Sequence, residues 1–321
     1  MTLFAIEQGI AVMDSEVADS MYRFFVDGLC RHVCAGQIMH DDMVLDARRR
    51  LVAANQAPPT VAQVKANVQK TGNPWAEAEP DLQALTQAQQ GHEVLVYFGP
   101  AARIKRPVVI RALCAILEKG GIGFSVLDEE GDPGLLLHQL GEQEAGAAAA
   151  RELVDKIRCA GARTIITPDA EAYQALKVGF GERPPLTDVE ILHTSEFLVK
   201  LLGWLTFNKP QHRRISYHDP CILARGAPSL DAPREIVRHI AETEALEIGP
   251  WNRELANCSG ECGGVPFTTP ALSKQAAQRR IREALDVGAD LVVAGSPASA
   301  GALGGNGLEV QELCEWVANS L

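Results

Sequence analysis

The 321-residue sequence predicts an α/β protein with two tandem units that each carry a parallel sheet, preceded by a small helical segment. Three observations support this prediction. From residue 93 onward, short apolar runs alternate with helical patterns, which favours parallel sheets covered by helices on both faces. The same order of elements occurs twice, about 120 residues apart. Residues 1–70 show helical spacing of apolar residues without strand-like runs.

The helical segment is expected over residues 1–75. Residues 41–55 begin with acidic residues and continue with Arg and Leu at helical spacing. A second helix is predicted over 60–70, with proline just before a Thr60 cap. The sequence TGNPW then ends this pattern, and residues 76–92 are expected to form a helix or a linker.

The first α/β unit is expected over residues 93–188. Its pattern begins with the apolar run EVLVYFG, continues with a helix that ends at glycine, and repeats this order. The predicted elements are a strand at 93–99, a helix at 106–121, a strand at 122–128, a helix at 141–162 and a strand at 163–168.

The second unit is expected over residues 189–321. It opens with a strand and a helix in 189–205, where Thr194 or Ser195 is the predicted cap and His193 caps or bridges the preceding loop. The elements that follow are a strand at 213–220, a helix at 232–242, a short strand at 246–249, a helix at 271–289 and a strand at 290–297. The phrases CAGARTIITPDAEAY and DVGADLVVAGSPASA match in element order, which supports an internal repeat.

Composition argues against several classes of function. The net charge of −11 at pH 7 argues against a nucleic-acid surface or an anionic membrane as the main partner. We find no uninterrupted apolar run long enough to span a bilayer. The N-terminus carries Glu7 and no basic region, so a secretory signal is not expected. The expected location is the cytoplasm, with peripheral membrane attachment through a partner as the alternative.

The eight cysteines are accordingly expected to be reduced thiols or metal ligands rather than disulfides. Three of them lie in helical patterns and are expected on helix faces or in the core, namely Cys114, Cys159 and Cys314. The remaining five are candidates for chemistry, namely Cys30, Cys34, Cys221, Cys258 and Cys262.

Parallel sheets of this kind bind ligands at the carboxyl ends of their strands. Three loops of the second unit are expected to meet there, namely YHDPC with Cys221, NCSGECGG with Cys258 and Cys262, and GSPAS with Ser296 and Ser299. The glycines in 260–264 suit a backbone wrapped tightly around a bound group. We therefore expect the fold to bring these distant side chains together.

On these motifs the two units resemble the paired cysteine-rich (CCG) domains of the heterodisulfide reductase and glycolate oxidase iron–sulfur subunit superfamily. The resemblance covers residues 93–305 and rests on YHDPC followed by LARGAPSLDAPREI, on HTSEFL, and on GDP within LDEEGDP. The family pattern is a strand ending in Cys, a Cys-Cys-Gly loop, and a strand ending in Cys-Pro-x-Cys. A ferredoxin-like helical domain often precedes these units, and its second cluster motif is Cys-x2-Cys-x2-Cys-x3-Cys-Pro.

The sequence departs from this pattern at most of the ligand places. In FFVDGLCRHVCA, Cys30 and Cys34 take the last two ligand places, whereas the other places are held by Phe24, Asp27 and, in place of proline, Ala35. The first unit keeps none of the five family cysteines, since their places are held by Pro100, Glu129, Glu130, Asp169 and Ala172. In the second unit Cys221 and Cys258 remain and Cys262 lies nearby, whereas the other places hold Ser259, Ser296 and Ser299.

We therefore expect at most one residual metal site. Cys221, Cys258 and Cys262 could hold an iron–sulfur cluster with an unusual fourth ligand, could form a zinc site with His218, or could remain free thiols without a cofactor. Cys30 and Cys34 are interpreted as a relic or as part of a shared site, because metal ligation needs a complete set of ligands.

Two further interpretations concern other side chains. The acids Glu129, Glu130 and Asp169 could bind a hard metal, but we prefer to interpret them as solvated loop residues. A nucleophilic role for Cys258 or Cys262 lacks a dedicated base beside either residue in the sequence.

The resemblance implies an iron–sulfur oxidoreductase subunit that takes part in electron transfer within a multi-subunit complex. Its partners would be other iron–sulfur or flavoprotein subunits, and nucleic acid is not expected among them. The alternative is a cofactor-depleted paralogue that scaffolds or regulates such a complex. In neither case is the chain expected to be catalytic alone.

Overall fold

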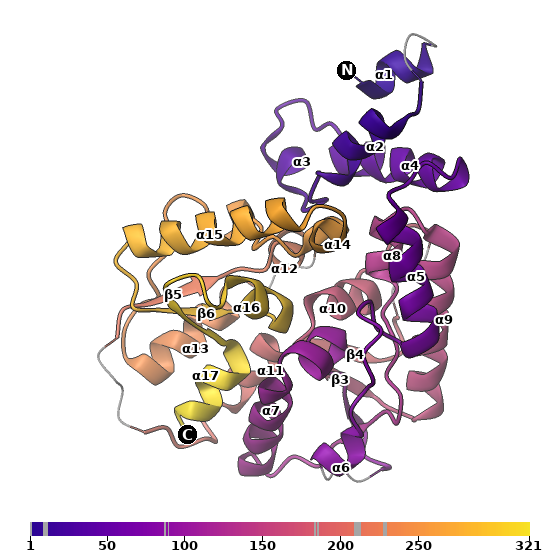
Figure 1. Cartoon of the computed structure of the whole chain (residues 1–321). Helices are drawn as coiled ribbons and strands as arrows, with labels where there is room; N and C mark the ends of the chain where they lie inside the picture. The colour runs from indigo at the N-terminus through magenta and orange to yellow at the C-terminus, as the bar shows by residue number, and fades with distance from the viewer. Residues whose placement is uncertain are drawn as a thin grey trace.

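The computed structural model describes residues 2–8, 12–86, 88, 90–182, 184, 186–208, 213–226 and 230–321. Their elements form two parallel sheets flanked by helices, with the first helices of the chain lying on one side of both sheets (Figure 1). This arrangement confirms the predicted α/β class.

The N-terminal segment is helical, as predicted. Its helices are α1 (Thr2–Glu7), α2 (Ser15–Tyr22), α3 (Leu29–Val33), α4 (His40–Ala53) and α5 (Pro59–Thr71), and α6 (Leu82–Thr86) lies in the segment 76–92 that follows. Apolar side chains of α2, α4 and α5 pack together with α8 (Leu135–Gln139) from the following unit. The predicted Thr60 cap is wrong, because α5 already begins at Pro59 and no side chain caps it. Proline at the first helical position has no N–H that a cap would have to satisfy.

The first sheet contains four parallel strands in the order β2-β1-β3-β4. They are β1 (Val94–Val96), β2 (Ser125–Val126), β3 (Thr164–Thr167) and β4 (Glu190–His193). A π-helical turn (Ala101–Lys105) follows β1, and the helices between and after the strands include α7 (Pro107–Lys119), α9 (Gln143–Cys159), α10 (Ala170–Lys177) and α11 (Thr194–Leu201). His193 is the N-cap of α11 in place of the predicted Thr194 or Ser195, and Glu196 completes a capping box.

The second sheet contains β5 (Ile215–His218), β6 (Leu291–Ala294) and β7 (Glu309–Glu312), in that order and all parallel. Its helices are α12 (Cys221–Arg225), α13 (Ala232–Ala241), α14 (Val265–Thr268), α15 (Pro270–Asp286), α16 (Pro297–Leu303) and α17 (Leu313–Asn319). The predicted strand at 246–249 is reduced to one parallel bridge between Leu246 and Ser216. With that bridge, the order of segments matches the first sheet, as an internal repeat requires.

Strand β4 (Glu190–His193) belongs to the first sheet and not to the second unit. The prediction assigned it to the start of the second unit, but β4 is hydrogen-bonded to β3 along its whole length. Its buried residues Ile191 and Leu192 lie opposite Ile165 and Ile166, which gives the apolar strand neighbours on the first sheet. A division at residue 188 would therefore separate two paired strands.

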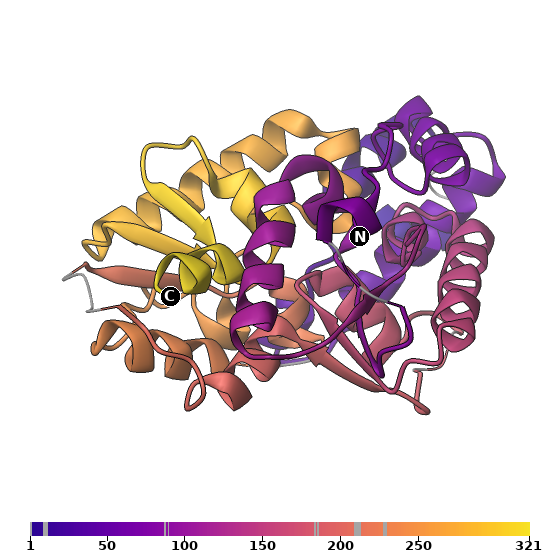
Figure 2. The same ribbon diagram turned by 90° about the horizontal axis from the view of Figure 1, so that it is seen from below.

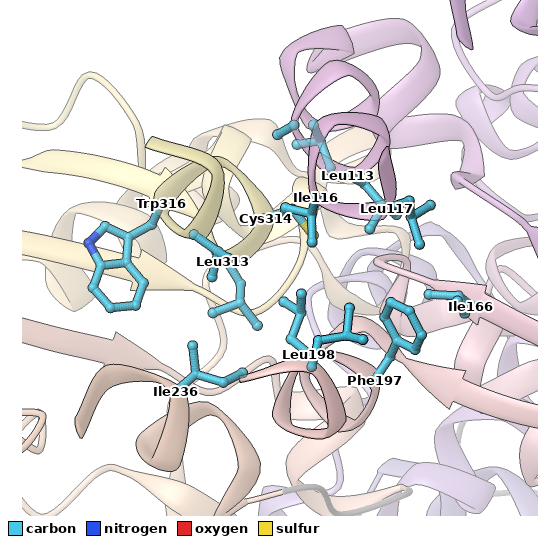
Figure 3. Packing of buried hydrophobic residues seen from close by; sticks show 14 of the residues in the cluster. Leu113, Ile116, Leu117, Ile166, Phe197, Leu198, Ile236, Leu313, Cys314 and Trp316 are labelled. Atoms are coloured by element: carbon cyan, nitrogen blue, oxygen red, sulfur yellow. The ribbon is translucent and has the colours of Figure 1, made fainter. Parts of the chain in front are cut away.

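One buried core joins the two units. Helix α11 packs against α13, and α17 packs against α7, so the last helix of each unit lies on the other unit. Figures 1 and 2 both show α17, near the C-terminus, beside α7. Figure 3 shows Ile116 of α7 next to Cys314 of α17, with Leu198 of α11 close to both. The mutual position of the two sheets is thus fixed by apolar packing.

Candidate metal centre

Three buried thiols converge in the second unit. Cys221 is the first residue of α12, Cys258 lies in the loop between α13 and α14, and Cys262 begins a short 3-10 segment (Cys262–Gly264). Their sulfur atoms all lie within 4.8 Å of one another, and the sulfurs of Cys221 and Cys262 are 2.7 Å apart. All three side chains are buried. The structure therefore brings the three predicted thiols together.

Glycines allow the loop that carries Cys258 and Cys262 to pack tightly. Gly260 and Gly263 have φ of 105° and 68°, which side chains other than glycine rarely adopt. A Cβ atom on Gly260 would collide with the Ser273 carbonyl oxygen, and one on Gly263 with the Phe25 carbonyl oxygen. The loop thus follows a path that only glycine permits at these two positions.

The three thiols share hydrogen bonds. Contacts with the thiols of Cys221 and Cys262 hold the pKa of Cys258 well below its usual range, and the Gly260 N–H adds to this by donating to the Cys258 sulfur. The hydrogen bond with Cys258 raises the pKa of Cys221, and those with Cys221 and Cys258 raise the pKa of Cys262. A thiophilic metal that displaced the remaining protons would meet three sulfur ligands.

Hydroxyl groups lie beside the thiols and bond to one another. The Ser259 hydroxyl donates to the Ser299 hydroxyl oxygen over 3.1 Å, and the Ser299 N–H donates to the Ser296 hydroxyl oxygen over 3.2 Å. Ser296 is in this way the N-cap of α16. Because hydroxyls are hard ligands, these residues do not extend the soft sulfur set.

A cavity of about 70 Å³ lies between the two units and reaches this site. From the second unit it is lined by Cys221, Cys262, Ser259, Ser296 and Ser299, among others. The first unit contributes Pro100, Asp132, Asp169 and Glu171 to the same cavity. The carboxyl ends of strands from both sheets therefore face a common space.

Comparison with known proteins gives the context of this site. The cysteine-rich domain family, CCG, matches residues 215–303, the span that carries all three thiols. The second unit thus matches the CCG family, and most of the chain is similar to proteins such as a heterodisulfide reductase subunit and FadF. The predicted resemblance is confirmed.

Similar proteins carry names that refer to iron–sulfur chemistry. A probable membrane-anchored ferredoxin of Chromohalobacter salexigens is 28% identical over 98% of this chain and 50% of its own length. One subunit of the dihydromethanophenazine:CoB–CoM heterodisulfide reductase of Methanosarcina barkeri is 25% identical over 88% of this chain and 72% of its own. The probable iron–sulfur-binding oxidoreductase FadF of Bacillus subtilis is 25% identical over 84% and 41%. The chain thus spans about half of the first of these relatives. In the described part of this chain, every helix is too short or too polar to cross a lipid bilayer.

In the first unit, an ion pair occupies the region where the resemblance places a CCG site. Glu130, at a family thiol place, accepts hydrogen bonds from the N–H groups of Phe98 and Gly99 over 2.7 and 2.9 Å. Its other neighbour is Arg103, whose Nε lies 3.0 Å from the carboxylate, and both side chains are fully buried. Arg103 also pairs with Glu79 and donates to the Gly131 carbonyl oxygen. Burial outweighs these contacts and raises the pKa of Glu130 to about 7.

The interpretation of these acids as solvated loop residues is wrong for two of the three. Glu129 is exposed, as expected, but Glu130 and Asp169 are buried. Asp169 is the N-cap of α10 and accepts a hydrogen bond from the Ala172 N–H over 2.8 Å. Both carboxylates thus accept hydrogen bonds from backbone N–H groups. The acids in the described residues form no group of three close ligands.

The N-terminal pair of thiols remains apart from the buried three. Cys30 is exposed in α3 and Cys34 caps its end, and neither forms a disulfide. Phe24 and Asp27, at the two places without thiols, both have structural contacts. The Phe24 carbonyl oxygen accepts from Arg48, and the Asp27 carboxylate lies 3.3 Å from Arg225 of α12. Within the described residues, Cys30 and Cys34 belong to no group of three close ligands.

His218 ends β5 but does not join the thiol group. Its Nδ1 accepts a hydrogen bond from Arg280 Nε over 3.1 Å, so the ring proton is on Nε2. Burial lowers the pKa of this histidine well below its usual value. Among the described residues, the potential metal ligands that lie within 4.8 Å of one another are the three cysteines without His218. The structure therefore does not assemble the predicted Cys3His set.

Two arginines near the thiols were not predicted from the sequence as parts of the site. Arg48 is fully buried, and the Arg225 side chain is only 6% exposed. A signal for Arg48 exists in the sequence, since it shares the apolar face of its helix with Val44, Ala47 and Leu51. A charged residue on such a face indicates a buried partner.

Proposed function

We propose that the chain is an iron–sulfur oxidoreductase subunit that transfers electrons within a multi-subunit complex through one residual site at Cys221, Cys258 and Cys262. The observation that supports this most directly is the convergence of the three buried sulfur atoms within 4.8 Å. Names of similar proteins support the redox role, since they include a heterodisulfide reductase component, FadF and an EtfAB:quinone oxidoreductase of Syntrophomonas wolfei.

The donor set fits a small sulfur-ligated group and does not fit the complete family set. Three thiol groups are present, whereas Ser259, Ser296 and Ser299 hold the other places and bond among themselves. An iron–sulfur group held by the three cysteines would supply one-electron redox chemistry. The chain itself supplies burial, which excludes water, and the Gly260 N–H, which donates to the Cys258 sulfur over 3.3 Å. Such N–H donors to sulfur raise the potential of bound clusters.

The second candidate is a scaffold without a cofactor that holds cluster-bearing partners together. The first unit favours it, since the buried Glu130–Arg103 pair keeps the α/β framework intact where the family has thiols. Under this proposal the three thiols of the second unit would be packing residues.

Metal and sulfide analysis of this chain, purified anaerobically without its partners, tests the first proposal. We expect iron and sulfide bound to this chain, and absorbance at about 400 nm from thiolate-to-iron charge transfer. A triple replacement, Cys221→Ser, Cys258→Ser and Cys262→Ser, should remove both signals. The matched control, Cys30→Ser with Cys34→Ser, should retain them.

Three outcomes would separate the candidates. Less than about a tenth of an equivalent of iron in the wild type would contradict the cluster proposal. Stoichiometric zinc without sulfide would contradict electron transfer at this site and would indicate a structural metal instead. The scaffold proposal requires that the triple variant still assembles with its partners and supports turnover of the complex, so loss of assembly would contradict it.

A further inference from the structure

Arg48 of α4 is a buried cation whose donors all bind carbonyl oxygens. Its Nη1 donates to the carbonyl oxygens of Gln139 and Gly263, each over 2.7 Å. Its Nε and Nη2 donate to the Met21 carbonyl oxygen over 3.2 and 2.9 Å, and Nη2 also donates to that of Phe24 over 2.6 Å. A guanidinium group has five N–H donors in a fixed fork, so these five bonds use its full capacity. Arg48 therefore connects three separate segments of the chain.

One of these segments is the peptide that directly follows Cys262. Gly263 is held from both sides, because its carbonyl oxygen accepts from Arg48 and its N–H donates to the Gln139 side chain over 3.1 Å. Its φ of 68° and the close approach of the Phe25 carbonyl oxygen leave no room for a Cβ atom at this position. Fixing this peptide fixes the direction in which Cys262 presents its sulfur.

Residues 24–27 contact the segments that carry the other two thiols. The Phe25 side chain packs against the cluster formed by Cys221, Cys258 and Cys262. Two residues on, the Asp27 carbonyl oxygen and carboxylate both contact Arg225, at the end of the helix that Cys221 begins. Arg225 also donates to the Glu254 and Ala256 carbonyl oxygens, in the segment that leads to Cys258. All three thiol-bearing segments are therefore tied to residues 24–27 or to Arg48.

We propose that Arg48 is a positioning residue for the three-thiol site, and that the N-terminal helical segment organises a metal centre whose ligands lie in the second unit. The inference rests on the proposed function for the identity of the site, and on the contacts of Gly263 for the role of Arg48. The N-terminal helical segment would then have a structural role that does not depend on its own incomplete cysteine motif. Partners that orient metal ligands in this way are worth about 10–100-fold in metal affinity.

Cobalt binding by the full-length chain tests this proposal. Apo protein is titrated anaerobically with Co²⁺, whose thiolate charge-transfer absorption reports sulfur ligation. Arg48→Met should weaken Co²⁺ binding by about tenfold or more. Arg48→Lys keeps the charge but has too few donors for the fork, so it should recover only part of the loss. Wild-type affinity in Arg48→Met would overturn the proposal.

The matched control is Arg103→Met, which removes another fully buried arginine and lies in the first unit. It should lower thermal stability and leave Co²⁺ affinity within about threefold of the wild type, because its partners Glu79, Glu130 and Gly131 lie outside the thiol loops. An equal loss of affinity in both arginine variants would show general destabilisation and overturn the specific role of Arg48. If Arg48→Met does not fold, Gln139→Ala removes the other bond to Gly263, and unchanged affinity in that variant would count against the proposal.

A readout without metal separates this inference from the proposed function. The rate at which iodoacetamide modifies Cys262 in the folded apo protein is measured by peptide mapping. We expect about a tenfold or greater increase in Arg48→Met, because a buried thiol becomes accessible when its loop opens locally, and little change in Arg103→Met. Absence of Co²⁺ binding in the wild type would contradict the metal site alone. Equal Cys262 rates in the wild type and Arg48→Met would contradict the positioning role.

Discussion

Several residues at the ligand places of the family pattern have a partner within the protein. Glu130 pairs with Arg103, Asp27 with Arg225, and Ser259 with Ser299. A buried polar group without a partner costs free energy, so a thiol can be replaced by these residues only where the surroundings satisfy them. The substitutions therefore preserve packing and polar satisfaction while they reduce the number of soft ligands.

Gly263 gives a prediction at the residue scale. Gly263→Ala should lower the free energy of unfolding by about 2–4 kcal/mol, because the positive φ costs about 1 kcal/mol and the new methyl group collides with the Phe25 backbone. Gly161→Ala is the matched control, since Gly161 has a similar φ of 70° with nothing within 4 Å of the new atom. It should cost about 1 kcal/mol. Urea unfolding measures both, and equal costs would show that the collision relaxes freely.

At the scale of elements, apolar strands were predictable and polar ones were not. β1, β3 and β6 are buried runs of Val, Ile and Leu, which the sequence marks clearly. β7 has the sequence EVQE and is mostly half-exposed at the sheet edge, so neither hydrophobicity nor alternation marks it. The convergence of three thiols followed from the rule that loops gather at the carboxyl ends of parallel strands.

The residues that hold the thiols could not be inferred in the same way. Arg48 binds carbonyl oxygens of residues 91 and 215 positions away in the chain. Backbone carbonyls are the same for every residue type, so no sequence pattern identifies such partners. His218 carries a typical ligand side chain next to the site, yet Arg280 occupies its Nδ1. Residue type and loop position thus predicted the thiols, whereas supporting contacts required the fold.

The loops at the ends of the second-unit strands give a prediction at the element scale. The triple variant Ser259→Cys, Ser296→Cys and Ser299→Cys places sulfur at positions that line the same cavity as Cys221 and Cys262. Iron and sulfide incorporation during anaerobic reconstitution should rise by about twofold or more over the wild type, because sulfur is a better ligand for iron–sulfur clusters than a hydroxyl. The matched control introduces Cys at Glu130, where the loss of the partner of Arg103 should prevent a comparable gain. Equal incorporation in the wild type and the triple variant would contradict the assignment of these places.

At the scale of the whole molecule, the exchange of terminal helices makes the two units interdependent. α17 covers α7 of the first unit, and α11 covers α13 of the second. The shared cluster includes Ile116, Ile236 and Leu313, all fully buried. Neither unit could lose its fold without exposing the apolar face of the other, so a common core of this kind favours cooperative unfolding.

The whole molecule is therefore expected to unfold in a single transition of its described core. Ile116→Ala in the first unit and Ile236→Ala in the second should each lower the free energy of unfolding by about 2–5 kcal/mol, as loss of a buried Ile side chain usually does. Far-UV circular dichroism follows helices throughout the chain, whereas fluorescence is dominated by the second half, which holds three of the four tryptophans, Trp204, Trp251 and Trp316. Both probes should give the same midpoint in urea, and both variants should shift the two curves together. Separate transitions, with one of them insensitive to Ile236→Ala, would show that the units fold independently and that the exchanged helices do not couple them.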